Sequence, residues 1–142
     1  MEKSITLRNI KADGNCMFRA LSDQMTFNQS LHIIYRQQIC DFLRNNQNIF
    51  IPFIAGLSTE NNCNIIDYIN DMEKPGTYGD NACLVAFSML KNVRIIIYSV
   101  SSTFSIIGQH HLNTIQLLLH NVHYYSVQRD KNIIENENYV II

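Results

Sequence analysis

Cys16 is the residue whose setting most clearly suggests chemistry. It follows Asp13, Gly14 and Asn15 and stands at the first turn of a predicted helix. A helix N-terminus presents unpaired N–H groups and a partial positive charge, and both favour a thiolate over a thiol. Glycine permits a tight turn that points backbone amides at one place, as an oxyanion hole requires. The segment therefore has the parts for nucleophilic catalysis, although a buried thiol at a helix cap fits the same pattern.

A nucleophilic cysteine needs a base, and the sequence offers five histidines. They are His32, His110, His111, His120 and His123. We expect His32 on the surface of a helix, His110 and His111 in a turn after Gly108, and His120 and His123 on either side of a tight connection between two strands. His123 opens the run 123–127, directly after a two-residue connection between predicted strands. Because a strand end can hold an imidazole rigidly, His123 is the candidate base, and a half-buried structural histidine on a sheet is the alternative.

Four helices are predicted from apolar residues at helical spacing. Their ranges are about 16–25, 30–44, 64–72 and 80–91. Ser30 is the expected cap of the second helix, and Asp80 or Asn81 is the expected cap of the fourth, because short polar side chains satisfy the first free amides of a helix.

Short β-prone runs follow the helices, separated by Ser, Gly, Asn and His. They cover residues 93–100, 104–108, 114–119 and 123–127. Helices first and strands second indicate an α+β fold, with N-terminal helices packed on a mainly antiparallel C-terminal sheet. We expect a single domain over residues 1–142, with residues 129–142 as a polar tail or an added edge strand.

Composition excludes several classes of function. The 142 residues carry a net charge of -1 and are 46% hydrophobic and 16% charged, which is typical of a globular domain without a broad basic surface for nucleic acid. The cysteines form no closely spaced pair, so neither a zinc site nor another cofactor is predicted. No apolar run reaches membrane-spanning length, and no signal-peptide pattern is present. We therefore expect a cytoplasmic protein whose thiols, Cys16 apart, pack in the core.

Three segments resemble motifs of one enzyme family, in the same order. Residues 11–21, Lys-Ala-Asp-Gly-Asn-Cys-Met-Phe-Arg-Ala-Leu, closely resemble the active-site motif of the OTU (ovarian tumour) cysteine proteases. Residues 75–81, Pro-Gly-Thr-Tyr-Gly-Asp-Asn, are similar to the middle loop of that family, and His-Tyr-Tyr-Ser-Val at 123–127 is similar to its closing strand. The resemblance covers about residues 5–128 and is strongest to the compact OTUD subgroup. It implies a papain-like fold and a deubiquitinase that cleaves isopeptide bonds at the ubiquitin C-terminus.

Carried onto this chain, the resemblance implies a role for each matching residue. Cys16 would be the nucleophile that forms a thioester, and His123 would be the general base. Asp13 would be an active-site residue that either shapes its loop or assists the histidine. The oxyanion hole would be formed by the backbone of Asp13, Gly14, Asn15 and Cys16. The substrate would be contacted by Tyr78, Gly79, Asp80 and Tyr124.

One position departs from the family pattern. Two residues after the base, many members carry Asn or Asp, which orients the imidazole, whereas this chain has Tyr125. A phenol holds its oxygen farther from the backbone than a carboxamide does. Asp13 is the first candidate to orient His123 instead, followed by Asp80 or Asn81. The remaining alternative is that no group orients the histidine and that activity is low.

Two functions from different classes therefore stay open. The first is a ubiquitin-specific cysteine hydrolase, and the second is a catalytically weak or inactive OTU-like module that binds ubiquitin or a ubiquitin-like modifier. In both cases we expect a monomer whose partner is ubiquitin or polyubiquitin, with no nucleic acid and no membrane.

Overall fold

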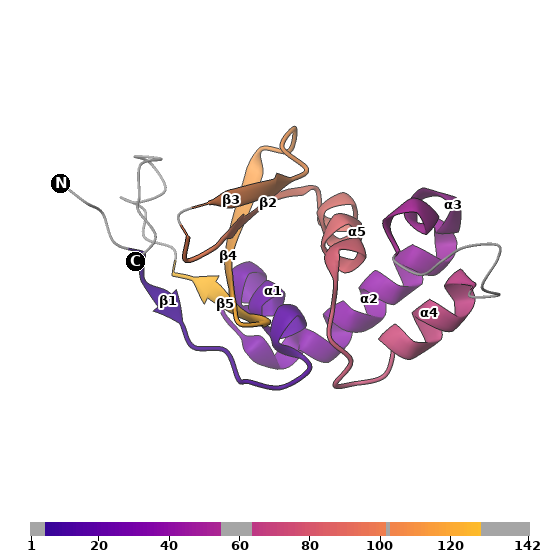
Figure 1. Cartoon of the computed structure of the whole chain (residues 1–142), viewed down its shortest axis with the longest axis horizontal. Helices are drawn as coiled ribbons and strands as arrows, with labels where there is room; N and C mark the ends of the chain where they lie inside the picture. Colours follow the sequence, from indigo (N-terminus) through magenta and orange to yellow (C-terminus); the bar gives the residue numbers. More distant parts are fainter. Residues whose placement is uncertain (1–4, 55–63, 102, 129–142) are drawn as a thin grey trace.

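The computed structural model describes residues 5–54, 64–101 and 103–128, which form a sheet with helices on one side (Figure 1). The helical elements are α1 (Cys16–Thr26), η1 (Gln29–Leu31), α2 (His32–Asn45), α3 (Gln47–Phe50), η2 (Ile51–Phe53), α4 (Ile65–Met72) and α5 (Asn81–Lys91). The strands are β1 (Leu7–Arg8), β2 (Val93–Tyr98), β3 (Phe104–Ile107), β4 (Asn113–His120) and β5 (His123–Val127). The predicted α+β architecture is confirmed.

The four predicted helices are confirmed as α1, α2, α4 and α5. Two begin at side-chain caps: the carboxamide of Asn64 accepts from the Asp67 amide at 2.9 Å, and the carboxylate of Asp80 accepts from the Cys83 amide at 3.3 Å. The predicted cap at Ser30 is wrong. The polar side chain that caps here is Asn28, which accepts from the Ser30 amide and begins the 3-10 turn η1, while α2 has no side-chain cap.

The sheet has the strand order β1-β5-β4-β2-β3. Three of its four pairings are antiparallel, which confirms a mainly antiparallel sheet. The parallel pairing of β2 with β4, in which Ile95 lies opposite Ile115, was not predicted. Neither was β1, whose two residues pair with the end of β5 and place a strand before the first helix. The expected edge strand near residue 140 lies outside the described residues.

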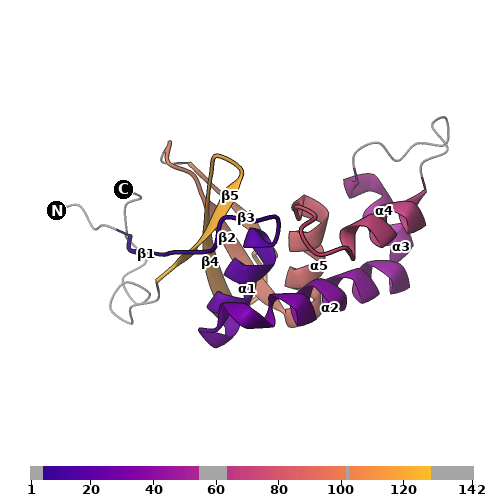
Figure 2. The ribbon, with the colours of Figure 1, turned by 90° about the horizontal axis from the view of Figure 1, so that it is seen from below.

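Two helices connect the sheet to the rest of the core. Helix α1 packs against β4 and β5, α5 packs against β2 and β3, and α2 contacts α1, α5 and α4 (Figures 1 and 2). Their facing side chains form one apolar cluster that includes Met17, Phe18, Ile39, Phe87 and Ile95. The helix that begins at Cys16 therefore lies directly against the strand that begins at His123.

His32 is buried, so its predicted surface position is wrong. It is 8% exposed, and its Nδ1 has no hydrogen-bond partner among the described residues. The reason is that η1 turns the chain so that α2 starts against α1. Burial lowers the pKa of His32, and the positive charge of Arg19 lowers it further.

Two of the three cysteines expected to pack in the core lie in the described part of the chain. Cys40 and Cys83 are free thiols and fully buried, as predicted, whereas Cys63 lies outside the described residues. Among the helices of the described ranges, none has both the length and the apolar character needed to cross a bilayer.

Candidate active site

Cys16 is the first residue of α1, at the end of the loop 13–15. The residue is 1% exposed and packs in the core cluster beside Met17 and Phe18. Its helix has no side-chain cap, because the carboxamide of Asn15 is directed to other partners. The first turn is free of acidic residues, so no carboxylate there opposes a negative sulfur. The structure thus places the thiol where the sequence predicted it, at a helix N-terminus.

The β4–β5 hairpin brings the His123 region to this thiol. The Sγ of Cys16 lies 4.0 Å from the carbonyl oxygen of Val122, the residue directly before His123. Asn121 and Val122 connect the strands with φ of 51° and 62°, which matches a two-residue type I′ turn. A positive φ is rare for a β-branched residue, so the turn at Val122 is strained. The contact joins two residues that are 106 positions apart in the sequence.

His123 is half-buried at the start of β5 and contacts an aromatic ring. Its imidazole lies edge-to-face with Tyr125, with ring centroids 4.5 Å apart and an interplanar angle of 77°. Within the described residues, no side-chain hydrogen bond joins His123 to Asp13, Asp80 or Asn81. The structure therefore brings Tyr125 to the histidine, and the carboxylates expected to orient it have other partners.

Asp13 shapes the nucleophile loop, which we define as residues 13–16. Its carboxylate accepts from the Nη2 of Arg19 at 3.0 Å and from the backbone amide of Asn15 at 2.9 Å. Burial opposes ionisation of this carboxyl, but the hydrogen bonds from Arg19 and Asn15 outweigh it and lower the pKa of Asp13. Of the two roles that the resemblance implied for Asp13, the contacts match loop shaping.

The amides of the nucleophile loop are unequally available to an oxyanion. Those of Asp13 and Asn15 donate to the Lys11 carbonyl and the Asp13 carboxylate, and that of Cys16 donates to the Asp13 carbonyl at a longer 3.2 Å. Among the described residues, the Gly14 amide has no acceptor. The backbone amides of Gly14, which is free, and of Cys16, whose hydrogen bond is long, are therefore the two best able to donate to a bound substrate among the described residues.

Residues 75–80, the part of the predicted middle loop that precedes α5, lie directly on the nucleophile loop. A Cβ on Gly14 would fall 1.7 Å from the carbonyl oxygen of Gly76, and a Cβ on Gly79 would fall 2.4 Å from the Sδ of Met17. Gly14 is required because backbone approaches backbone too closely for a larger residue, whereas at Gly79 the atom in the way belongs to a flexible methionine side chain that could shift. Glycine at position 14 therefore allows the Gly76 carbonyl to approach the backbone, and it is not needed for a left-handed conformation, since its φ is not positive.

The residues expected to contact substrate differ in their freedom to do so. Tyr78 is 57% exposed on the middle loop. Asp80 is exposed, but its carboxylate caps α5 and accepts from the Tyr68 hydroxyl at 2.6 Å. Tyr124 is half-buried, and burial raises its pKa to about 12, with the nearby Cys16 adding to the effect. Within the described part of the chain, Tyr78 and Tyr124 therefore have no side-chain partner that keeps them from a substrate, whereas Asp80 is engaged in holding α5.

Three residues of this region were not assigned a role from the sequence. Arg19 pairs with Asp13, Val122 contacts the thiol, and Arg36 of α2 donates to the nucleophile loop. A signal existed for Arg36, because it falls on the apolar face of its helix, near Ile39 and Cys40. Nothing in the local sequence pairs positions 19 and 13 or 122 and 16, since the fold makes these contacts.

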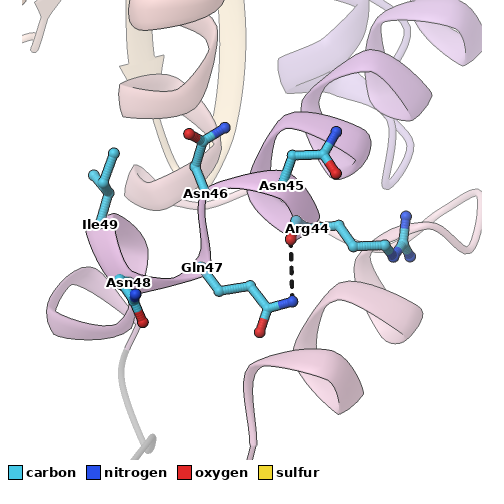
Figure 3. A pocket seen from close by; sticks show the side chains of 6 residues that line it. All are labelled: Arg44, Asn45, Asn46, Gln47, Asn48 and Ile49. Atoms are coloured by element: carbon cyan, nitrogen blue, oxygen red, sulfur yellow. Dashed lines mark hydrogen bonds between the residues drawn. The ribbon is translucent and has the colours of Figure 1, made fainter.

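A polar pocket is present elsewhere, at the junction of α2 and α3 (Figure 3). It is lined by Arg44, Asn45, Asn46, Gln47, Asn48 and Ile49. None of these residues belongs to the predicted site. Within the described residues, no group of three His, Cys, Asp or Glu side chains could hold a metal ion.

Known proteins are similar to this chain in sequence. The "OTU domain-containing protein 3" of Mus musculus is 30% identical over 98 residues, which is 69% of this chain and 24% of that protein. The "OVARIAN TUMOR DOMAIN-containing deubiquitinating enzyme 7" of Arabidopsis thaliana is 36% identical over 89 residues, 63% of this chain and 22% of that protein. The chain thus spans about a quarter of the length of these relatives.

Solved structures share the fold. The "OTUD1 OTU domain" superposes with a TM-score of 0.74 at 25% identity, covering 88% of this chain and 86% of that one. An "Ovarian Tumor (OTU) domain in complex with Ubiquitin" has a TM-score of 0.71 at 16% identity, covering 87% of this chain and 69% of that one. Residues 11–131 match the family described as "OTU-like cysteine protease". With the cysteine at the head of α1, the histidine at the head of β5 and this match, the chain belongs to the OTU-like cysteine protease family.

Proposed function

We propose that this protein is a deubiquitinase that hydrolyses isopeptide bonds at the C-terminus of ubiquitin. The observation that carries the proposal is the contact between the Cys16 thiol and the hairpin that presents His123. Relatives named as a deubiquitinating enzyme and a "Putative ubiquitin thioesterase" support the substrate class, as do neighbours solved with ubiquitin.

In the first half-reaction, His123 takes the proton of the Cys16 thiol and the sulfur attacks the carbonyl carbon of the last ubiquitin residue. The carbonyl oxygen becomes an oxyanion that the amides of Gly14 and Cys16 stabilise. The protonated His123 then gives its proton to the lysine amine, the C–N bond breaks, and a thioester to Cys16 remains.

In the second half-reaction, water replaces the amine. His123 takes a proton from the water as the oxygen attacks the thioester carbon, and the C–S bond breaks as the tetrahedral intermediate collapses. The ubiquitin carboxylic acid is released and loses its remaining proton to solvent, and the Cys16 thiolate recovers its proton from His123. No metal or cofactor takes part in these steps.

Tyr125 is the positioning residue for His123 in this proposal. Its ring stands edge-on to the imidazole at 4.5 Å and restricts rotation of the histidine without a hydrogen bond. Asp13 acts one step further away, by fixing the turn that carries the oxyanion donors. Tyr78, Gly79 and Tyr124 would contact the ubiquitin tail in this proposal.

Cleavage of the eight types of di-ubiquitin tests the proposal. We expect wild-type protein to release mono-ubiquitin from at least one type, and Cys16→Ala and His123→Ala to abolish release while remaining folded. His111→Ala is the matched control, because His111 lies in the turn after β3 and contacts His110 rather than the site. Full activity of Cys16→Ala, or no cleavage of any type by the wild type, would refute the proposal.

A second candidate is a module that binds ubiquitin with little turnover. It is favoured by the absence, within the described residues, of a hydrogen bond that orients His123. Saturable binding of ubiquitin by the wild type without hydrolysis of a C-terminal ubiquitin amide would support this candidate over the enzyme.

We further propose that the protein acts as a monomer in the cytoplasm. A single chain holds Cys16, His123 and the middle loop together. Light scattering at the concentration of the assay should give the mass of one chain, and activity that requires a larger species would contradict this part of the proposal.

A further inference from the structure

Arg36 is a buried cation without a carboxylate partner. It lies in α2 and is 3% exposed, and among the described residues no acidic side chain lies within ion-pair distance of it. Its guanidinium stacks over the ring of Phe18, 4.0 Å from the ring centroid. A buried charge without an opposite charge is costly, so the residue must be held by strong hydrogen-bond acceptors.

Those acceptors come from two separate segments, the end of α4 and the nucleophile loop. The Nη1 of Arg36 donates to the carbonyl of Met72, at the end of α4, at 2.8 Å. Its Nη2 donates to the side-chain oxygen of Asn15 at 2.8 Å and to the carbonyl of Gly14 at 3.3 Å. The planar fork of arginine suits such divergent acceptors, which one ammonium group could not satisfy together.

The Asn15 side chain extends this connection to the middle loop. The Oδ1 that accepts from Arg36 also accepts from the backbone amide of Gly76 at 2.8 Å. The amide is well placed because the carbonyl of Gly76 presses against Gly14. One oxygen therefore joins α2, the nucleophile loop and the middle loop. The linker from α4 to α5 passes beside the start of α1 in both views (Figures 1 and 2).

We propose that Arg36 and Asn15 are positioning residues that lock the middle loop onto the nucleophile loop and so prepare the site for the ubiquitin tail. The inference rests on the proposed function for its substrate, but the lock itself is a property of the free protein. If the lock is absent, binding must order residues 76–79, and the affinity for the tail falls. The chemical step depends mainly on Cys16 and His123 and changes less.

Hydrogen exchange at the Gly76 amide tests the lock without any substrate. We expect Asn15→Ala to lower the protection of this amide by about fivefold or more, since its acceptor is removed. Arg36→Met should lower it too, because the Asn15 side chain then loses the donor that holds it. Arg94→Met is the matched control, since Arg94 donates to Thr114 in the sheet, and should leave Gly76 unchanged.

Arg36→Lys replaces Arg36→Met in the exchange experiment if Arg36→Met does not fold. Lysine retains the positive charge but cannot reach the Gly14, Asn15 and Met72 acceptors together. We expect it to lose protection at Gly76 as well. Protection at the wild-type level in Arg36→Lys or Asn15→Ala, in protein that is folded by circular dichroism, would overturn the proposal.

A double-mutant cycle tests whether the two residues act as one unit. With a ubiquitin that carries a C-terminal coumarin amide, each single variant should raise KM about five- to tenfold and change kcat by less than about threefold. The variant with both substitutions should have the same KM as the single variant with the higher KM, because each substitution breaks the same connection. If the two increases in KM multiply in the double variant, or if only kcat falls, the proposal that Arg36 and Asn15 act as one unit is overturned. If the wild type does not hydrolyse this substrate, the proposed function fails, and the exchange data still decide the lock.

Discussion

Tyr125→Phe and Tyr125→Leu distinguish two ways in which residue 125 could hold the imidazole of His123. The rings lie edge-to-face, 4.5 Å apart at 77°, and no hydrogen bond joins them. Phe keeps this ring contact and removes the hydroxyl. Leu removes the ring but keeps apolar bulk against the small cluster of Ile5, Tyr98, Leu118 and Val127, which limits the loss of stability.

The size of the effect follows from the energy of the ring contact. An edge-to-face pair contributes about 0.5–1.5 kcal/mol beyond the burial of its area. If that energy holds the productive orientation of His123, its loss corresponds to about a two- to twelvefold fall in kcat. We therefore expect Tyr125→Leu to lose activity by about this factor and Tyr125→Phe to stay within about twofold of the wild type.

Initial rates on ubiquitin coumarin amide, at saturating substrate, measure this difference. Urea unfolding of each variant shows whether the protein is fully folded at the assay temperature. Equal losses in Tyr125→Phe and Tyr125→Leu would mean that the hydroxyl orients the histidine. Wild-type kcat in Tyr125→Leu would mean that residue 125 does not position His123 at all.

Three further predictions concern stability and reactivity. Asp13→Asn should lower the free energy of unfolding by about 1 kcal/mol near neutral pH. Burial opposes ionisation of Asp13, but its hydrogen bonds outweigh burial and set the folded pKa below 3.8, so this stabilisation should vanish as the pH falls through the folded pKa. Urea unfolding that shows the same loss of stability in Asp13→Asn near neutral pH and below the folded pKa would contradict this prediction. Val122→Gly should raise the melting temperature, since relief of about 1–2 kcal/mol of left-handed strain exceeds the added flexibility of glycine, of about 0.5–1 kcal/mol, and a lower temperature in calorimetry would count against the strained turn. Burial raises the pKa of both Cys40 and Cys83 to about 12, so iodoacetamide followed by peptide mass mapping should find neither modified in the native protein, and early modification of either would show that the core opens.

Local sequence rules predicted the elements that carry their own signals. Asp80 caps α5 because its side chain reaches an amide three residues on, and the two-residue connection before His123 could be recognised from the short gap between β-prone runs. The prediction at Ser30 failed because Asn28 caps the 3-10 turn η1, which contains Ser30, and the Ser30 hydroxyl donates to the Asn28 side chain instead of accepting from a helix amide. A single-residue rule cannot rank two neighbouring caps.

Contacts between distant segments could not be predicted in this way. The parallel pairing of β2 with β4 depends on where β3 returns, and β1 is too short to show a strand pattern. The same is true of the site. The positions of Cys16 and His123 could be predicted, because each stands at the end of an element, whereas the bonds of Asp13 to Arg19 and of Asn15 to Arg36 depend on how loops and α2 pack.

The most direct test of the central claim is the reaction of the protein with ubiquitin that carries an electrophile at its C-terminus. Mass spectrometry of the wild type should show one ubiquitin per chain, attached to the peptide that contains Cys16. The adduct should be absent in Cys16→Ala and form much more slowly in His123→Ala. Ubiquitin bound reversibly without an adduct, or an adduct on another cysteine, would contradict the assignment of Cys16 as the nucleophile.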